Sequence, residues 1–164
     1  MTASDSPPAG PARQSRAWHI QAQGDRCLLV RFGDTLDADV GRTCLAAARL
    51  LREAGLPGVT DVVPSFAAVA VHYRPSADGP DHEQLAERVA GVFSGGIPSD
   101  AIDGREVEIP VCYGGEYGPD LPEVAARAGI GEDEVVALHT RPGAMVFMLG
   151  FAPGFPYIGV HDEK

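Results

Sequence analysis

At 164 residues the chain is long enough for one ordinary domain and part of a second. Hydrophobic residues make up 45% and charged residues 22%, which is normal for a soluble globular protein. The net charge of -10 argues against a nucleic-acid partner, which would need a basic surface to neutralise its phosphates, and no polybasic stretch is present to hold an anionic membrane. We therefore expect neither nucleic acid nor a membrane among the partners.

Lysine is almost absent from the sequence. Lys164 is the only lysine, and the other basic residues are arginines. A Walker A loop needs a lysine on the nucleotide phosphates, so this chain is expected to contain no P-loop. If ATP is used, another polypeptide has to hold its phosphates in that way.

Three cysteines stand at wide spacings, Cys27, Cys44 and Cys112, and no C-x-x-C pair is present. This usage predicts reduced thiols in a cytoplasmic protein and gives no support to a metal site. Residues 1–16 are rich in Pro, Ala and Ser and lack the apolar core of a signal peptide, so we expect a disordered tail there.

The first structured part is expected at 17–104, as an α+β domain. Short β-branched and apolar runs predict strands, and apolar residues at helical spacing predict helices that stop at glycines. The expected strands are 18–24, 27–32, 59–63 and 66–73, and the expected helices are 36–54 and one centred on Leu85–Phe93. One further strand would complete a ferredoxin-like split βαβ sandwich.

Residues 105–112 are the candidate for that further strand. Val107, Ile109 and Val111 alternate with polar or proline positions, and Pro110 restricts the segment to an edge or a strand end. Two interpretations remain open: the segment completes the first domain, or it begins the next one.

Beyond Tyr113 the sequence predicts a glycine-rich loop and two short helices. Asp120 resembles an N-cap with Glu123 three residues later, and Gly129 ends that helix. A second helix is expected at 132–139. Residues 144–151 are almost continuously apolar, so we expect a strand that is buried on both faces.

His139 is the candidate catalytic residue. A helix C-terminus favours a positively charged side chain, so a role as acid or hydrogen-bond donor is possible, although many such histidines only cap the helix or face solvent. Tyr113 and Gly114 begin a loop whose backbone amides could hold an anion. A plain turn explains the same loop equally well.

The tract 150–157 is the candidate substrate or partner pocket. Pro153 and Gly154 suit the central positions of a type II turn, with positive φ at the glycine. Phe151, Phe155 and Tyr157 would then be presented on a rigid loop. A tight corner of a β-barrel is the alternative interpretation.

Four segments resemble one known family: VVPSFAAVAVHYRP at 62–75, IPVCYGGEYGPDLPEVA at 109–125, EDEVVALHT at 132–140 and MLGFAPGFPYIG at 148–159. The family comprises the B subunit of 5-oxoprolinase, allophanate hydrolase subunit 1 and the KipI inhibitor of a histidine kinase. The resemblance implies an α+β N-terminal domain followed by a cyclophilin-like β-barrel of the carboxyltransferase type. The barrel would begin at 105 and continue past 164, so its C-terminal part is expected to be missing.

The resemblance also implies a function shared between subunits. A homologous second barrel subunit and a third catalytic subunit would open 5-oxoproline to glutamate with ATP, or hydrolyse allophanate, and the isolated chain would be inactive. A KipI-like inhibitor that binds a sensor kinase without catalysis is the alternative. The matching motif positions are Tyr113, Gly114, His139, Phe151, Pro153, Gly154, Phe155 and Tyr157.

Overall fold

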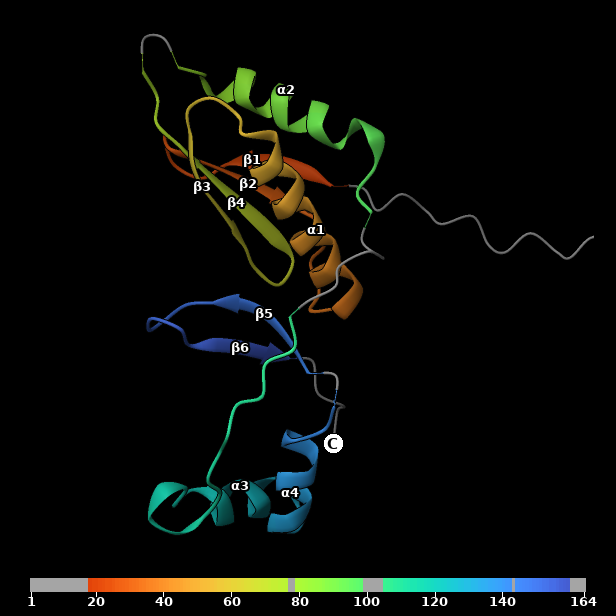
Figure 1. The fold of residues 1–164 in the computed structure, drawn as a ribbon, viewed down its shortest axis with the longest axis vertical. Coiled ribbons are helices and arrows are strands. Elements are labelled where there is room, and N and C mark those ends of the chain that lie inside the picture. Colours follow the sequence, from red (N-terminus) through yellow and green to blue (C-terminus); the bar gives the residue numbers. More distant parts are fainter. Residues whose placement is uncertain (1–17, 77–78, 99–104, 143, 160–164) are drawn as a thin grey trace, which may run out of the picture.

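The computed structural model describes residues 18–76, 79–98, 105–142 and 144–159. The tail expected at 1–16 lies outside the described residues. Helices and strands are mixed in both halves of the chain, so the structure is of the α+β class (Figure 1). In the described part of the chain, no helix is long and apolar enough to cross a membrane.

The N-terminal half is built on a four-stranded antiparallel sheet with the strand order β1-β2-β4-β3. Helix α1 connects β2 to β3, and β4 lies between these two strands in the sheet. This unit is therefore a split βαβ arrangement. The strands are β1 His19–Ala22, β2 Cys27–Arg31, β3 Val59–Pro64 and β4 Ala68–Tyr73. All four predicted strands are therefore present.

Helices α1 (Ala38–Ala54) and α2 (His82–Val92) cover the sheet and share one apolar core with it (Figure 1). The Asp37 side chain starts α1 by accepting hydrogen bonds from the N–H groups of Asp39 and Val40, at 2.8 and 3.0 Å. Gly55, in the left-handed conformation, ends the helix as predicted. A 3-10 turn, η1 (Phe93–Gly95), continues α2 up to the predicted glycine stop.

The strand predicted at 105–112 does not form. Val107, Ile109 and Val111 are 50–57% exposed, and the segment belongs to neither sheet. Alternating apolar residues give a segment an apolar face, but a strand also needs a neighbouring strand to form hydrogen bonds with its backbone. The edge of β2 on which a further strand would pair is already occupied by β1. The N-terminal sheet is thus complete without this segment.

The C-terminal half holds a helix pair and a β-hairpin. After a 3-10 turn, η3 (Gly115–Tyr117), come α3 (Leu121–Ala128) and α4 (Glu132–His139), followed by β5 (Met145–Leu149) and β6 (Pro156–Gly159). The two strands pair with each other in antiparallel fashion. Figure 1 shows this hairpin between the N-terminal sheet layer and the α3–α4 pair.

Two features predicted for this half differ in the structure. Asp120 stands at the N-cap position of α3, as predicted, but it has helical backbone angles and its side chain makes no capping hydrogen bond, so the capping box with Glu123 does not form. Glu123 instead forms an ion pair with Arg127 at 2.9 Å. Strand β5 is not buried on both faces, because Phe147 is its only buried residue, whereas Val146 and Leu149 are 40% and 61% exposed.

Candidate functional site

The loop at the tip of the hairpin, residues 150–157, is called here the aromatic loop. The turn predicted at Pro153 and Gly154 is present: the Phe155 N–H donates to the Ala152 carbonyl at 3.0 Å, and Gly154 has φ +78°. The Gly150 N–H donates to the Phe155 carbonyl at 3.1 Å and closes the loop at its base. These two hydrogen bonds hold the three rings of the loop on a short, defined backbone.

Phe151 is the strained residue of the aromatic loop. It is the one described residue other than glycine with positive φ, at 63°, and the Ala152 N–H donates across it to the Gly150 carbonyl at 2.7 Å. This three-residue γ-turn is costly for a side chain with a β-carbon. The ring is 92% exposed, so burial does not repay the strain. Strain held at an exposed ring is typical of a site that binds something.

Five rings form a continuous series from the loop tip to the interior, which we call the aromatic series. Successive centroid distances are 5.9 Å for Phe151–Phe155, 5.3 Å for Phe155–Tyr157, 6.2 Å for Tyr157–Phe66 and 5.1 Å for Phe66–Phe147. The first three contacts are edge-to-face and the last is stacked, the arrangements that aromatic pairs favour. The aromatic loop is therefore connected through packed side chains to the N-terminal half.

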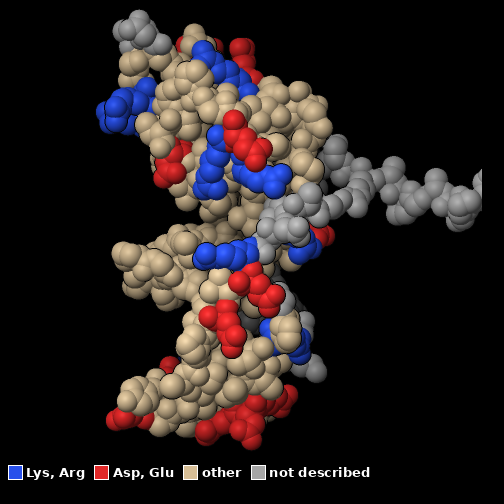
Figure 2. Space-filling view, viewed as in Figure 1, with Lys and Arg blue, Asp and Glu red and all other residues tan. Residues whose placement is uncertain are grey.

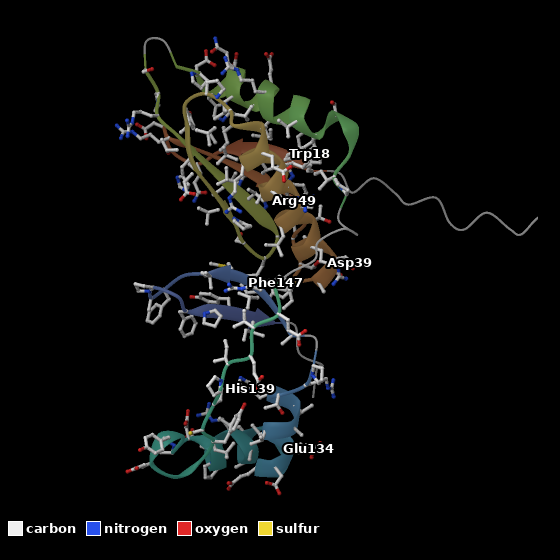
Figure 3. The ribbon with its side chains drawn as sticks, in the orientation of Figure 1. Trp18, Asp39, Arg49, Glu134, His139 and Phe147 are labelled. Atoms are coloured by element: carbon white, nitrogen blue, oxygen red, sulfur yellow. The ribbon has the colours of Figure 1, made fainter. Side chains whose placement is uncertain are left out.

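The inner end of the aromatic series lies against helix α1. Phe147 is 1% exposed, and a β-carbon on Gly41 would lie only 2.2 and 2.4 Å from two of its ring atoms. The ring therefore occupies the space that any other residue at position 41 would fill. Figure 3 shows the labelled Phe147 between the hairpin and the lower end of α1.

A second cluster joins two predicted site residues, Tyr113 and His139, which we call the Tyr–His pair. The Tyr113 hydroxyl is 2.5 Å from His139 Nδ1, and the two rings meet edge-to-face with centroids 5.7 Å apart. His139 ends α4 and Tyr113 precedes Gly114, whose φ of +72° starts the η3 turn. If the hydroxyl donates to Nδ1, Nε2 carries the proton and is free to act as a donor.

The structure does not join these two groups into one site. In the described part of the chain, no hydrogen bond or ring contact links the aromatic loop to the Tyr–His pair. Figure 3 shows His139 on the side of the hairpin that faces α3 and α4, away from Phe147. Within the described residues, the aromatic loop and the Tyr–His pair are therefore two separate candidate sites.

The cysteines offer no buried nucleophile. Burial raises the pKa of the Cys44 thiol to about 12, and burial also raises the pKa of the Cys27 thiol, so both stay protonated near neutral pH. Cys112 is exposed. Within the described residues, no three His, Cys, Asp or Glu side chains gather closely enough to hold a metal ion.

Three participants in this arrangement are not predicted by the sequence: Gly41, Phe66 and Phe147. The sequence predicts Phe66 in a strand, but β4 begins two residues later and Phe66 lies in the turn before it. A glycine within a strong helical pattern is the signal that points to Gly41, because glycine there weakens a helix and suggests a close neighbour. Nothing local identifies that neighbour as Phe147.

Comparison with known proteins places these observations in a family. Residues 18–164 match the family model described as carboxyltransferase domain, subdomain C and D. The chain is 35% identical over 155 residues to the B subunit of 5-oxoprolinase from Bacillus subtilis, covering 90% of this chain and 65% of that protein. The protein of the same name from Escherichia coli O157:H7 is 35% identical over 152 residues, covering 87% and 66%. The chain thus spans just under two thirds of these relatives.

Solved structures were also compared with this chain. The protein named TTHA0988 superposes with a TM-score of 0.67 at 37% identity, over 84% of this chain and 26% of that chain. The N-terminal domain of the histidine kinase inhibitor KipI from Bacillus subtilis covers 57% of this chain at 20% identity, with a TM-score of 0.43. That second likeness is too low to carry an argument about function.

Proposed function

Because this chain belongs to the carboxyltransferase-domain family, subdomains C and D, we propose that it is a subunit of a 5-oxoprolinase-type hydrolase complex. The observation that carries the proposal is its similarity, along nearly its whole length, to proteins named as the B subunit of 5-oxoprolinase. The complex would hydrolyse the lactam of 5-oxoproline to glutamate, with ATP consumed. We assign it to the cytoplasm, as the cysteine usage predicts.

The aromatic loop would form one wall of the substrate pocket. The lactam of 5-oxoproline is planar, and a planar amide packs well against aromatic faces, which Phe155 and Tyr157 supply. Phe151, strained and exposed, would contact substrate or the neighbouring subunit. Pro153 and Gly154 would hold these rings in place without touching the reacting atoms.

The Tyr–His pair would supply a proton. Hydrolysis adds a water oxygen to the lactam carbonyl carbon and breaks the C–N bond, so the departing nitrogen needs a proton. His139 Nε2 is the proposed donor, and Tyr113 would fix its orientation through Nδ1. Because the two clusters are separate in this chain, a second subunit or further chain would bring them to one substrate.

The remaining components would be supplied by partners. A homologous barrel subunit would complete the pocket, and a third subunit would hold ATP, since this chain has no lysine before Lys164 to build a P-loop. Residues 17–104 would form a ferredoxin-like domain in which β1 takes the place of the last strand. Residues 105–164 would belong to a cyclophilin-like barrel of the carboxyltransferase type.

Reconstitution tests the proposal. Glutamate release from 5-oxoproline and ATP is measured with the two partner subunits, with and without this chain. We expect activity only in the full set, and His139→Gln to lower kcat by about 10²–10⁴-fold. His19→Gln makes the same substitution at an exposed histidine of β1 and is the matched control, expected to stay within about twofold.

Two results would remove the proposal. One is a full set of subunits that releases no glutamate, and the other is activity that does not depend on this chain. Allophanate hydrolysis and inhibition of a sensor kinase stay predictions. With the same protein, ammonia release from allophanate tests the first, and a kinase autophosphorylation assay tests the second.

A further inference from the structure

We propose that Gly41 of helix α1 is a positioning residue for the aromatic loop, acting through Phe147 and the aromatic series. Only the expected effect of Gly41 on activity rests on the proposed function. The role of Gly41 in holding the hairpin rests on the contacts of Phe147 with Gly41 and Phe66.

The first step is the contact between Gly41 and Phe147. Gly41 is buried within α1, and a β-carbon there would lie 2.2 Å from the Phe147 ring and 3.0 Å from the Met145 methyl group. Ordinary contact begins near 3.4 Å, so an alanine would push the ring outward by about 1.2 Å. Glycine inside a helix lowers stability relative to alanine. The space that Gly41 leaves for the Phe147 ring, which we call the seat, explains why glycine is found at this position.

The second step is the connection from this seat to the loop. Phe147 stacks on Phe66 at 5.1 Å, and Phe66 contacts Tyr157, which follows the aromatic loop turn. The Phe66 ring also lies 3.7 Å from the position that a β-carbon on Gly159 would occupy, so it lies beside Tyr157 and Gly159 of β6. A packed series of rings has little free volume, and a shift at one end is therefore passed to the other.

The third step concerns what else could hold the hairpin. Strands β5 and β6 pair only with each other, and Phe147 is the sole buried hydrophobic residue among the described residues of the hairpin. The orientation of the aromatic loop relative to the N-terminal half therefore depends chiefly on this one ring and its seat. Gly41 touches no proposed substrate atom, so its role is positioning and not catalysis.

The chain contains its own reporters for the test. Its three methionines are Met1, Met145 and Met148. Met145 lies at the seat, whereas the Met148 methyl group and the Tyr157 ring both lie within 3.6 Å of the β-carbon position of Gly150, at the base of the loop. Methyl NMR of methionine-labelled chain therefore reads the seat and the loop separately.

Gly41→Ala is expected to move both the Met145 and Met148 signals. Gly91→Ala is the matched control, because Gly91 also lies in a helix and a β-carbon there meets nothing within 4 Å. We expect Gly91→Ala to leave both signals in place. A Met148 signal that stays fixed while Met145 moves would overturn the inference.

A second variant decides the matter if Gly41→Ala fails to fold. Phe66→Leu breaks the series between Phe147 and Tyr157 without adding an atom to the helix. It is expected to move the Met148 signal, and an unmoved signal would refute the coupling.

Activity provides the last readout. In the reconstituted complex, Gly41→Ala is expected to lower kcat about 10- to 100-fold, because displacements near 1 Å have effects of that size. A purely structural role would reduce only the amount of folded chain, leaving kcat per folded chain and KM unchanged, and that outcome would overturn positioning. If the wild-type complex releases no glutamate, the proposed function fails, while the methionine signals still decide the coupling.

Discussion

Gly154→Val tests whether the aromatic loop depends on one backbone angle. Gly154 has φ +78°, and a β-carbon there would meet nothing within 4 Å, so the substitution introduces backbone strain without a steric clash. Holding a β-branched residue in this region costs about 1–3 kcal/mol. At about 2–4 °C per kcal/mol for a chain of this size, the melting temperature should fall by several degrees.

The strain is expected to be released locally by opening the turn. Loss of the hydrogen bond from the Phe155 N–H to the Ala152 carbonyl should speed amide exchange at Phe155, and at Gly150 through the base of the loop. Hydrogen exchange and thermal unfolding followed by circular dichroism measure the two effects. Tyr157→Phe, which keeps the ring and removes only the hydroxyl, should leave both unchanged.

Gly154→Asn is the discriminating control, because asparagine tolerates positive φ much better than valine does. It should lose clearly less stability than Gly154→Val. Equal losses for the two variants would show that φ is not the cause. Unchanged exchange at Phe155 and Gly150 in Gly154→Val would refute the dependence of the loop on this turn.

Three further predictions follow from burial and composition. Phe147→Ala should lower the free energy of unfolding by about 3–5 kcal/mol in urea titration, because it removes a fully buried ring, and a loss below about 1 kcal/mol would contradict its role as the hairpin anchor. Burial raises the pKa of the Cys44 thiol from 9.0 to about 12, so only the unfolded state ionises between pH 9 and pH 12. The free energy of unfolding should therefore fall across that window, and Cys44→Ala should reduce the fall. Calorimetry should show no micromolar binding of ATP to the isolated chain, and such binding would prove the P-loop argument wrong.

Most of the N-terminal half is predictable because local signals and long-range packing agree there. Apolar residues at helical spacing in α1 face the sheet, and Asp37 and Gly55 supply caps that act within one turn. The predictions that failed needed information about neighbours. Alternation at 105–112 describes a strand face but not whether a second strand is present to pair with it.

The candidate site divides in the same way. The turn at Gly154 follows from residue preference alone, because only the residues of the turn determine its angles. The contact between Tyr113 and His139 joins a loop to the end of a helix, and the contact between Gly41 and Phe147 joins two halves of the chain. Neither contact leaves a local pattern, so residue types suggested Tyr113, His139 and the aromatic loop, but neither their grouping nor the parts played by Gly41 and Phe147.

The two sheets differ in how their outer strands would meet another chain. In the N-terminal sheet, β1 is only four residues long, and β3 has an irregular register beside the charged Asp61, features that discourage intermolecular pairing. The hairpin also has a four-residue strand, β6, and an irregular register in β5, but residues 145–159 include no charged side chain, and Figure 2 shows this projection as an uncharged surface. Strand addition and, at high concentration, aggregation of this chain are therefore expected to begin at β5 or β6. A lysine substituted at exposed Val146 or Ile158 should raise the solubility limit without disturbing the N-terminal half.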